Sequence, residues 1–232
     1  MHFEHSPEVW RDFPKLVPGV LFAEGITPEV ATDARAAAFT AAAATRLATA
    51  TESELPEIQA WRRAFAAMGL KPTQYRCAAE SLLRRFRKEG TLPRLHPLVD
   101  LCNAISLAFA IPVAVFDVAK VSGYLQVRYS HGDEGYLAFS GDLEHPAAGE
   151  VIFADQVRRA HARRWSNRQS AYSAVENATT RALIVAEALH DSAVSDIPEL
   201  MAAIARELDA AWAVKPEVAV LTAASPRFTF GH

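Results

Sequence analysis

The chain has 232 residues, half of them hydrophobic, which suits one domain with a sizeable core, with or without a helical extension. Its formal net charge of −3 excludes general electrostatic attraction to nucleic acid, so nucleic-acid contact requires a local basic patch. The sequence has no C-x-x-C pair, no apolar run long enough to span a membrane and no secretory signal at its start, so we expect a cytoplasmic protein with no metal ion and no membrane contact.

The first half of the chain predicts one strand followed by helices. Residues 17–26 (VPGVLFAEGI) are an apolar run between prolines, which is typical of a short strand. The alanine-rich run that follows predicts a helix, because alanine has the highest helix propensity. Helices are expected at residues 28–50, 55–68, 76–89 and 97–109.

From Pro112 onward the pattern changes to short β-branched and aromatic segments separated by turn residues. Strands are expected at residues 113–116, 124–129, 136–139, 151–154 and 158–165, whereas residues 180–188 fit a strand or a helix. An amphipathic helix follows, beginning at Ser195 or Asp196. Helices followed by clustered strands predict an α+β fold with a largely antiparallel sheet.

Three polar residues lie inside the apolar segment at residues 98–117. Asp100, Asn103 and Ser106 are spaced three apart and share one flank of the predicted helix. Burying such groups without hydrogen bonds costs roughly 1–3 kcal/mol each, so we expect them to have partners. Asp100 and Asn103 are expected to be hydrogen-bonded to neighbouring elements, and Ser106 to be either such a contact or part of a pocket.

Two clusters of basic residues offer local positive charge. Arg84, Arg87 and Lys88 share one face of a helix, which is either a phosphate-binding face or a solvated face paired with Glu80 and Glu89. The second cluster is at residues 158–165, where a strand would place alternate basic side chains on opposite faces ahead of a tryptophan. One face either lines a groove or protects an edge strand.

The segment LVDLCNAISLAFAIPVAVFD at residues 98–117 resembles the VVD-x-x-N…P-x-x-x-FD segment of the B3/B4 domain of bacterial phenylalanyl-tRNA synthetase beta subunits, which hydrolyses wrongly charged tRNA. The similarity covers about residues 61–188 and is strongest to free-standing proteins that look like that domain alone. The resemblance implies a strand at 180–188 and a β-sandwich-like core flanked by helices. It also implies an N-terminal strand and helical extension at 1–60, packed on a B3/B4-like domain at 61–232.

Two residues associated with the synthetase editing site have no counterpart here. The synthetase motif P-x-H-A-F-D carries a histidine where this chain has Ala114. The glycine-rich stretch that supplies a glutamate in the synthetase is replaced by RRWSNRQSAYS at residues 163–173. The chemistry or the amino-acid preference must therefore differ, and tyrosine editing is not expected.

The resemblance implies a deacylase that acts in trans and needs no cofactor. Its expected partners are the aminoacylated acceptor end of a tRNA and the amino-acid moiety, and no DNA partner is expected. It is not a tRNA ligase by itself. Two alternatives are a non-catalytic module that binds RNA, a nucleotide or an amino acid, and a hydrolase of another small ester or amide. The catalytic candidates are Asn103, Ser106 and Arg168. The substrate-binding candidates are Arg76, Glu80, Asn103, Ser106, Trp165, Arg168 and Gln169. The RNA-binding candidates are Arg84, Arg87, Lys88, Arg163 and Arg164.

Overall fold

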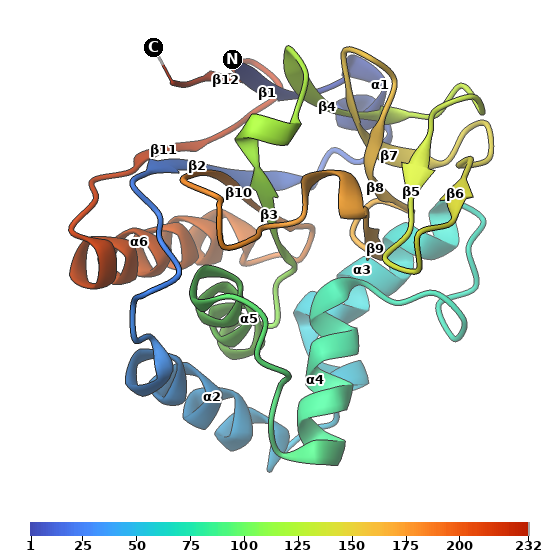
Figure 1. Ribbon diagram of the computed structural model, residues 1–232. Helices are drawn as coiled ribbons and strands as arrows, with labels where there is room; N and C mark the ends of the chain where they lie inside the picture. The colour runs from blue at the N-terminus through green and yellow to red at the C-terminus, as the bar shows by residue number, and fades with distance from the viewer. Residues whose placement is uncertain (232) are drawn as a thin grey trace.

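Two β-sheets and the helices around them make up the fold of the computed structural model, which describes residues 1–231 (Figure 1). The helices are α1 (Pro7–Asp12), α2 (Asp33–Leu47), α3 (Pro56–Ala67), α4 (Ala78–Glu89), α5 (Pro97–Phe109) and α6 (Ala193–Trp212). The strands are β1 (His2–His5), β2 (Val17–Glu24), β3 (Val113–Asp117), β4 (Tyr124–Tyr129), β5 (Tyr136–Leu137), β6 (Leu143–Glu144), β7 (Val151–Asp155), β8 (Ala160–Arg163), β9 (Arg168–Gln169), β10 (Arg181–Ala188), β11 (Glu217–Val220) and β12 (Arg227–Thr229).

The strand order links the two ends of the chain. The six-stranded sheet has the order β12-β1-β4-β7-β8-β9, and the four-stranded sheet has the order β11-β2-β10-β3. Only β1 and β4 pair in parallel among the named strands of residues 1–231, and β5 and β6 form a separate two-stranded sheet. The predicted α+β class with largely antiparallel sheets is therefore confirmed.

The two larger sheets pack face to face. The rings of Phe116 on β3 and Phe153 on β7 lie 5.3 Å apart between them, and Phe3 on β1 joins the same apolar cluster. The other face of the four-stranded sheet is covered by α5 and α6 (Figure 1). Because the central strands of this sheet are buried on both faces, they are apolar over most of their length rather than alternating.

Strand β10 shows how this burial orients side chains. Leu183 and Val185 belong to the cluster between the sheets, whereas Ile184 and Ala186 belong to the cluster under the helices. The period of two in a strand therefore turns the next residue, Glu187, toward the space between the sheets. Glu187 therefore places a buried carboxyl group beside the apolar side chains between the two sheets.

A close approach between β2 and α6 fixes the helix on the sheet. A Cβ atom at Gly19 would lie 2.5 Å from Cγ of Met201 and 2.8 Å from Cγ2 of Ile197. A side chain at this position would force Met201 and Ile197 to shift, so the glycine permits the close approach of β2 and α6.

Several predicted elements differ at their ends. The helix expected at 28–50 starts at Asp33, and the last helix starts at Ala193 rather than at Ser195 or Asp196. Strand 180–188 is confirmed as β10. No helix of residues 1–231 combines the length and the apolar character needed to cross a bilayer. The division at residue 60 stays a prediction, although β1 and β2 lie within sheets built mainly from later strands.

The strand expected at residues 158–165 is wrong at both ends. Only Ala160–Arg163 is a strand, because Arg158, Arg164 and Trp165 adopt positive φ angles of 64°, 47° and 56°. The expected alternation of basic side chains on two faces therefore does not occur. The left-handed conformation instead turns the chain back from β8 to β9.

Candidate functional site

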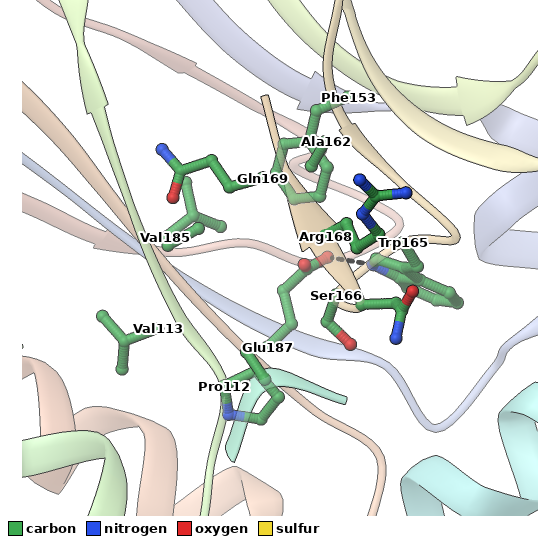
Figure 2. Close-up of a pocket in the computed structure, with 13 residues that line it drawn as sticks. Pro112, Val113, Phe153, Ala162, Trp165, Ser166, Arg168, Gln169, Val185 and Glu187 are labelled. Carbon is green, nitrogen blue, oxygen red and sulfur yellow. Dashed lines mark hydrogen bonds between the residues drawn. The ribbon is translucent and has the colours of Figure 1, made fainter. Parts of the chain in front are cut away.

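A small apolar cavity lies where β3, β9 and β10 meet the start of α4 (Figure 2). Its volume is about 60 Å³, which is room for a few waters or a small side chain. Its lining is Ala78, Pro112, Val113, Ala114, Phe153, Ala162, Trp165, Ser166, Asn167, Arg168, Gln169, Val185 and Glu187. Five of these residues come from the RRWSNRQ stretch, which forms one wall.

Glu187 is the acidic residue of this cavity. It is 4 % exposed, and its Oε1 accepts hydrogen bonds from Nε2 of His5 at 2.6 Å and from Nε1 of Trp165 at 2.9 Å. Both contacts fall on the same carboxylate oxygen, so they fix the orientation of the Glu187 side chain. The other oxygen, Oε2, makes no hydrogen bond within residues 1–231, so it is free to bind a group in the cavity.

The Trp165 side chain positions the Glu187 carboxylate and is not free to stack on a ligand ring. Its indole is fully buried and packs edge-on against Phe13 at 4.7 Å and Trp61 at 5.1 Å. Trp61 in turn donates to the backbone carbonyl of Glu187 at 3.2 Å. Free stacking of Trp165 on a ligand ring is therefore excluded, although its edge lines the cavity.

Arg168 and Gln169 lie side by side on β9 but differ in their freedom. Gln169 donates to the carbonyl of Val115 on β3 at 2.6 Å, which joins the two sheets beside the cavity. The side chain of Arg168 is 44 % exposed and reaches Glu144 only at 3.4 Å. Arg168 is thus the more exposed and more loosely paired of the two side chains.

Arg76 and Glu80 are not in the cavity lining, although Ala78 between them is. Glu80 is fully buried, and its Oε2 accepts a hydrogen bond from Nε of Arg62 at 3.2 Å. Nε of Arg76 lies 3.4 Å from Oε1 of Glu80. The predicted substrate contact of Glu80 is therefore corrected to an ion pair that links α3 to α4. The amide of Asn167 donates to the carbonyl of Arg76 at 2.7 Å and so ties α4 to the cavity wall.

The polar residues of α5 separate into different roles. Ser106 is fully buried and donates to the carbonyl of Ile111 at 2.6 Å, so it holds the chain reversal after α5 and is excluded as a catalytic or binding group. Asp100 accepts from the backbone N–H of Leu95 at 2.9 Å, and burial raises its pKa. Asn103 is half-buried and makes no side-chain hydrogen bond within residues 1–231, so the anchoring role predicted for it is wrong.

Asn103 instead faces two surface hollows of about 350 and 280 Å³. The smaller hollow shares Val113 and Gln169 with the Glu187 cavity, so the two spaces adjoin. Phe139, which is 70 % exposed, stands at its rim. The hollow and the cavity therefore share a wall that includes Gln169.

The first basic cluster has a buried partner that sequence spacing did not indicate. Arg84 and Arg87 both pair with Glu52, at 3.2 and 2.9 Å, and Glu52 is 1 % exposed. Arg85 pairs with Glu89 at 2.9 Å. Lys88 is exposed and forms no ion pair in the described part of the chain, so it is the free cation of this face.

Two arginines of the second basic cluster make contacts with other side chains of the fold. Arg163 is 6 % exposed and pairs with Glu150 at 2.9 Å and with Glu144, so its predicted RNA contact is corrected to an ion-pair network. Arg164 places its guanidinium 4.7 Å from the ring centroid of Tyr75 and is half-buried. Both contacts hold the chain reversal between β8 and β9.

Cysteine chemistry is not available at this site. Burial raises the pKa of both Cys77 and Cys102 to about 12, so neither is a thiolate nucleophile at neutral pH.

The sequence-based assignment missed both Glu187 and His5. The one signal for Glu187 is an acid within the apolar run that follows Arg181 in the strand, since a buried carboxylate requires partners. Its partners lie 182 and 22 residues away, so no local pattern connects them.

Comparison with known proteins supplies the family. A family model described as the B3/4 domain matches residues 60–202. Phenylalanine–tRNA ligase beta subunits are similar over shorter stretches: that of Cereibacter sphaeroides is 29% identical over 94 residues, that of Aromatoleum aromaticum 33% over 75, and that of Legionella pneumophila strain Paris 34% over 70. These stretches cover 40%, 32% and 30% of this chain and only 12%, 9% and 8% of the relatives.

Among solved structures, an N-terminal fragment of the phenylalanyl-tRNA synthetase beta subunit from Pyrococcus horikoshii matches with a TM-score of 0.45 and 9% identity, over 92% of this chain and 49% of that one. The sequence match to the family model is the stronger finding, since it spans more than half of the 232 residues. On that match, the chain belongs to the B3/4 domain family.

Proposed function

We propose that this protein hydrolyses the ester bond between a small amino acid and the terminal ribose of a mischarged tRNA. The observation that carries the proposal is the Glu187 carboxylate, held through one oxygen by His5 and Trp165 and open through the other to an apolar cavity. The similarity to tRNA ligase beta subunits supports an aminoacylated tRNA as the substrate class.

The chemistry needs one base and one oxyanion partner. Glu187 Oε2 would accept a proton from a water molecule as that water attacks the ester carbonyl. Arg168 lines the cavity, and its guanidinium, once turned from Glu144 toward the ester, would stabilise the developing oxyanion. The tetrahedral intermediate would then collapse, with the proton passing to the leaving ribose hydroxyl and the free amino acid as the second product. An ester is labile enough for positioning and these two groups to suffice.

The size of the cavity supports a small side chain. An apolar cavity of about 150 Å³ is enough to hold benzene. The cavity beside Glu187 is less than half that size, at about 60 Å³. A phenyl or phenol ring therefore does not fit without rearrangement, which favours alanine, serine or a similarly small substrate.

The test is deacylation of tRNAs charged with alanine, serine, valine, phenylalanine and tyrosine. Wild-type protein should hydrolyse the small esters and spare the aromatic ones. Glu187→Gln should lower the rate by roughly 100-fold, because general-base catalysis typically contributes that much. Glu199→Gln removes an exposed carboxylate on α6 and serves as the matched control.

A second function, binding without turnover, has one specific observation in its favour. Ala114 lines the cavity at the position where the synthetase motif described above carries a histidine. If wild-type protein hydrolyses no charged tRNA but binds tRNA or a free amino acid, the binding function replaces the hydrolase. Hydrolysis of simple amino-acid esters alone would indicate a small-molecule esterase instead.

A further inference from the structure

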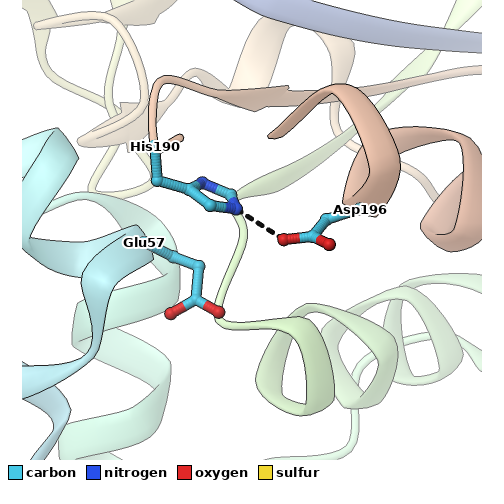
Figure 3. A group of neighbouring side chains, drawn as sticks. All are labelled: Glu57, His190 and Asp196. Carbon is cyan, nitrogen blue, oxygen red and sulfur yellow. Dashed lines mark hydrogen bonds and ion pairs between the residues drawn. The ribbon is translucent and has the colours of Figure 1, made fainter. Parts of the chain in front are cut away.

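Three side chains that could bind a metal meet outside the cavity, just beyond the C-terminal end of β10. Glu57 lies in the first turn of α3, His190 follows β10, and Asp196 lies in the first turn of α6. Each offers one ligand atom, and the three atoms lie within 4.8 Å of one another. Figure 3 shows the side chains converging from these three segments, with Nε2 of His190 facing Asp196 at 2.7 Å.

Two of the three side chains are buried and incompletely satisfied. Glu57 is 7 % exposed, and its Oε2 has no hydrogen-bond partner anywhere in residues 1–231. His190 is 4 % exposed, and its Nδ1 is also without a partner over the same residues. A buried carboxylate oxygen with no donor carries a desolvation cost that a bound cation would remove.

Hydrogen bonds from neighbouring residues orient the two carboxylates, as the hydrogen-bonding partners of the ligands do in metal sites. Arg46 donates to Oε1 of Glu57 at 2.7 Å, which leaves Oε2 free. Ser192 and Ser195 donate to the two oxygens of Asp196 at 2.6 and 3.1 Å. The cluster brings two carboxylates together with one guanidinium, that of Arg46, and this excess of acidic groups favours a cation.

We propose that Glu57, His190 and Asp196 bind one divalent transition-metal ion. One imidazole and two carboxylates suit Zn²⁺ and neighbouring ions, and three protein ligands leave a coordination position for water. This inference replaces the expectation of a metal-free protein that the sequence motifs gave. It does not depend on the proposed deacylase activity.

Such an ion would fasten the elements that hold Glu187. Helix α3 carries Glu57 and, one turn later, Trp61, whose indole donates to the backbone of Glu187. His190 lies three residues beyond Glu187 in the chain. Metal binding would therefore join α3, the end of β10 and α6 at a single point, in addition to the His190–Asp196 contact.

The experiment uses the full chain without an affinity tag, treated with a chelator and then dialysed. Titration with Co²⁺ should produce visible d–d absorption that saturates at one equivalent and is abolished by Zn²⁺. Zn²⁺ at micromolar concentration should raise the melting temperature, and the gain should fall at low pH because the ligands must be deprotonated. Glu57→Gln and Asp196→Asn should each weaken Co²⁺ binding by at least about tenfold.

Asp191→Asn is the matched control, because this exposed carboxylate is adjacent to His190 but outside the cluster. It should bind Co²⁺ as the wild-type protein does. Absence of both the Co²⁺ spectrum and the Zn²⁺-dependent stabilisation in wild-type protein overturns the proposal, whether or not the variants fold. Equal Co²⁺ affinity in wild type, Glu57→Gln and Asp196→Asn overturns it as well, since the ion would then lie elsewhere.

Discussion

Arg163 and Arg168 face each other in the register of β8 and β9, and both guanidinium groups lie over the ring of Tyr136, at 5.5 and 5.4 Å. Their surroundings nevertheless differ. The side chain of Arg163 is 7 % exposed and paired with two glutamates, whereas that of Arg168 is 44 % exposed and only loosely paired. Only Arg168 can turn toward a ligand without leaving a buried charge unpaired.

Replacing Arg168 should therefore separate activity from stability. Arg168→Ala should lower the deacylation rate by roughly 100-fold, the loss typical of one oxyanion donor. Its free energy of unfolding should change by less than about 0.5 kcal/mol, as for an exposed side chain. Arg168→Lys should restore activity only in part, because the planar fork is lost. Arg163→Ala is the contrasting variant, and urea unfolding should show it to be destabilised by about 3–5 kcal/mol.

The two polar residues of α5 should respond in opposite ways to truncation. Ser106→Ala leaves the buried carbonyl of Ile111 without its donor and should lower stability by about 1–3 kcal/mol. Asn103→Ala removes no side-chain hydrogen bond of the described structure and should change stability by less than about 0.5 kcal/mol. Urea denaturation of both variants makes the comparison, and an equal loss in both would contradict these roles.

Sequence pattern predicted the elements well where local chemistry decides them. Pro97 opens α5 and Gly90 ends α4, both as their residue types favour. The failure at residues 158–165 has a tertiary cause, because Arg164 and Trp165 adopt positive φ angles that neither residue type favours. Their side chains are held there by Tyr75 and Glu187, which come from distant parts of the chain.

The candidate site was less predictable than the fold. The wall formed by residues 165–169 follows from the position of that stretch in the resemblance, and the structure places it at the cavity. Glu187 could not be identified this way, because its role depends on hydrogen bonds from two other segments. Likewise Glu80 pairs with Arg62 and Arg163 pairs with Glu150, and both partners are too distant in sequence for a helical spacing rule to reveal.

RNA contact by the α4 face is best tested at Lys88. Reversing Arg84 or Arg87 would also disrupt their pairs with buried Glu52, so lost binding would be ambiguous. Lys88→Glu should weaken tRNA binding and reduce the slope of log K against log salt by about 1. Filter binding at several salt concentrations measures this slope. Lys215→Glu, at another exposed lysine, should behave as wild type.

Acid sensitivity should come in part from Glu134. Burial alone would raise the pKa of this carboxyl, but hydrogen bonds from Ser130, the His131 backbone and Arg128 outweigh it and lower the pKa to about 2 from 4.5. Because the folded state holds the ionised form, Glu134 stabilises the protein above about pH 4.5, and this contribution is lost as the pH falls toward 2.

Glu134→Gln should accordingly be less stable than wild type at neutral pH. Its stability should also fall less steeply between about pH 5 and pH 2, because one fewer proton is taken up on unfolding there. Urea midpoints across this range report the difference. Parallel curves for the two proteins would show that other carboxylates dominate, and Glu199→Gln provides the surface control.

The pairing of β1 has a consequence for the time course of folding. Phe3 lies opposite Leu125 on one side and opposite Phe228 on the other, so β1 becomes an interior strand only when β12 joins it. Contacts between residues so distant in sequence form slowly, because a long loop must close first. On the ribosome β1 would remain an exposed edge until β12, the last strand in chain order, has emerged. His5, the residue of β1 that holds Glu187, would therefore belong to an exposed edge strand until β12 pairs with β1.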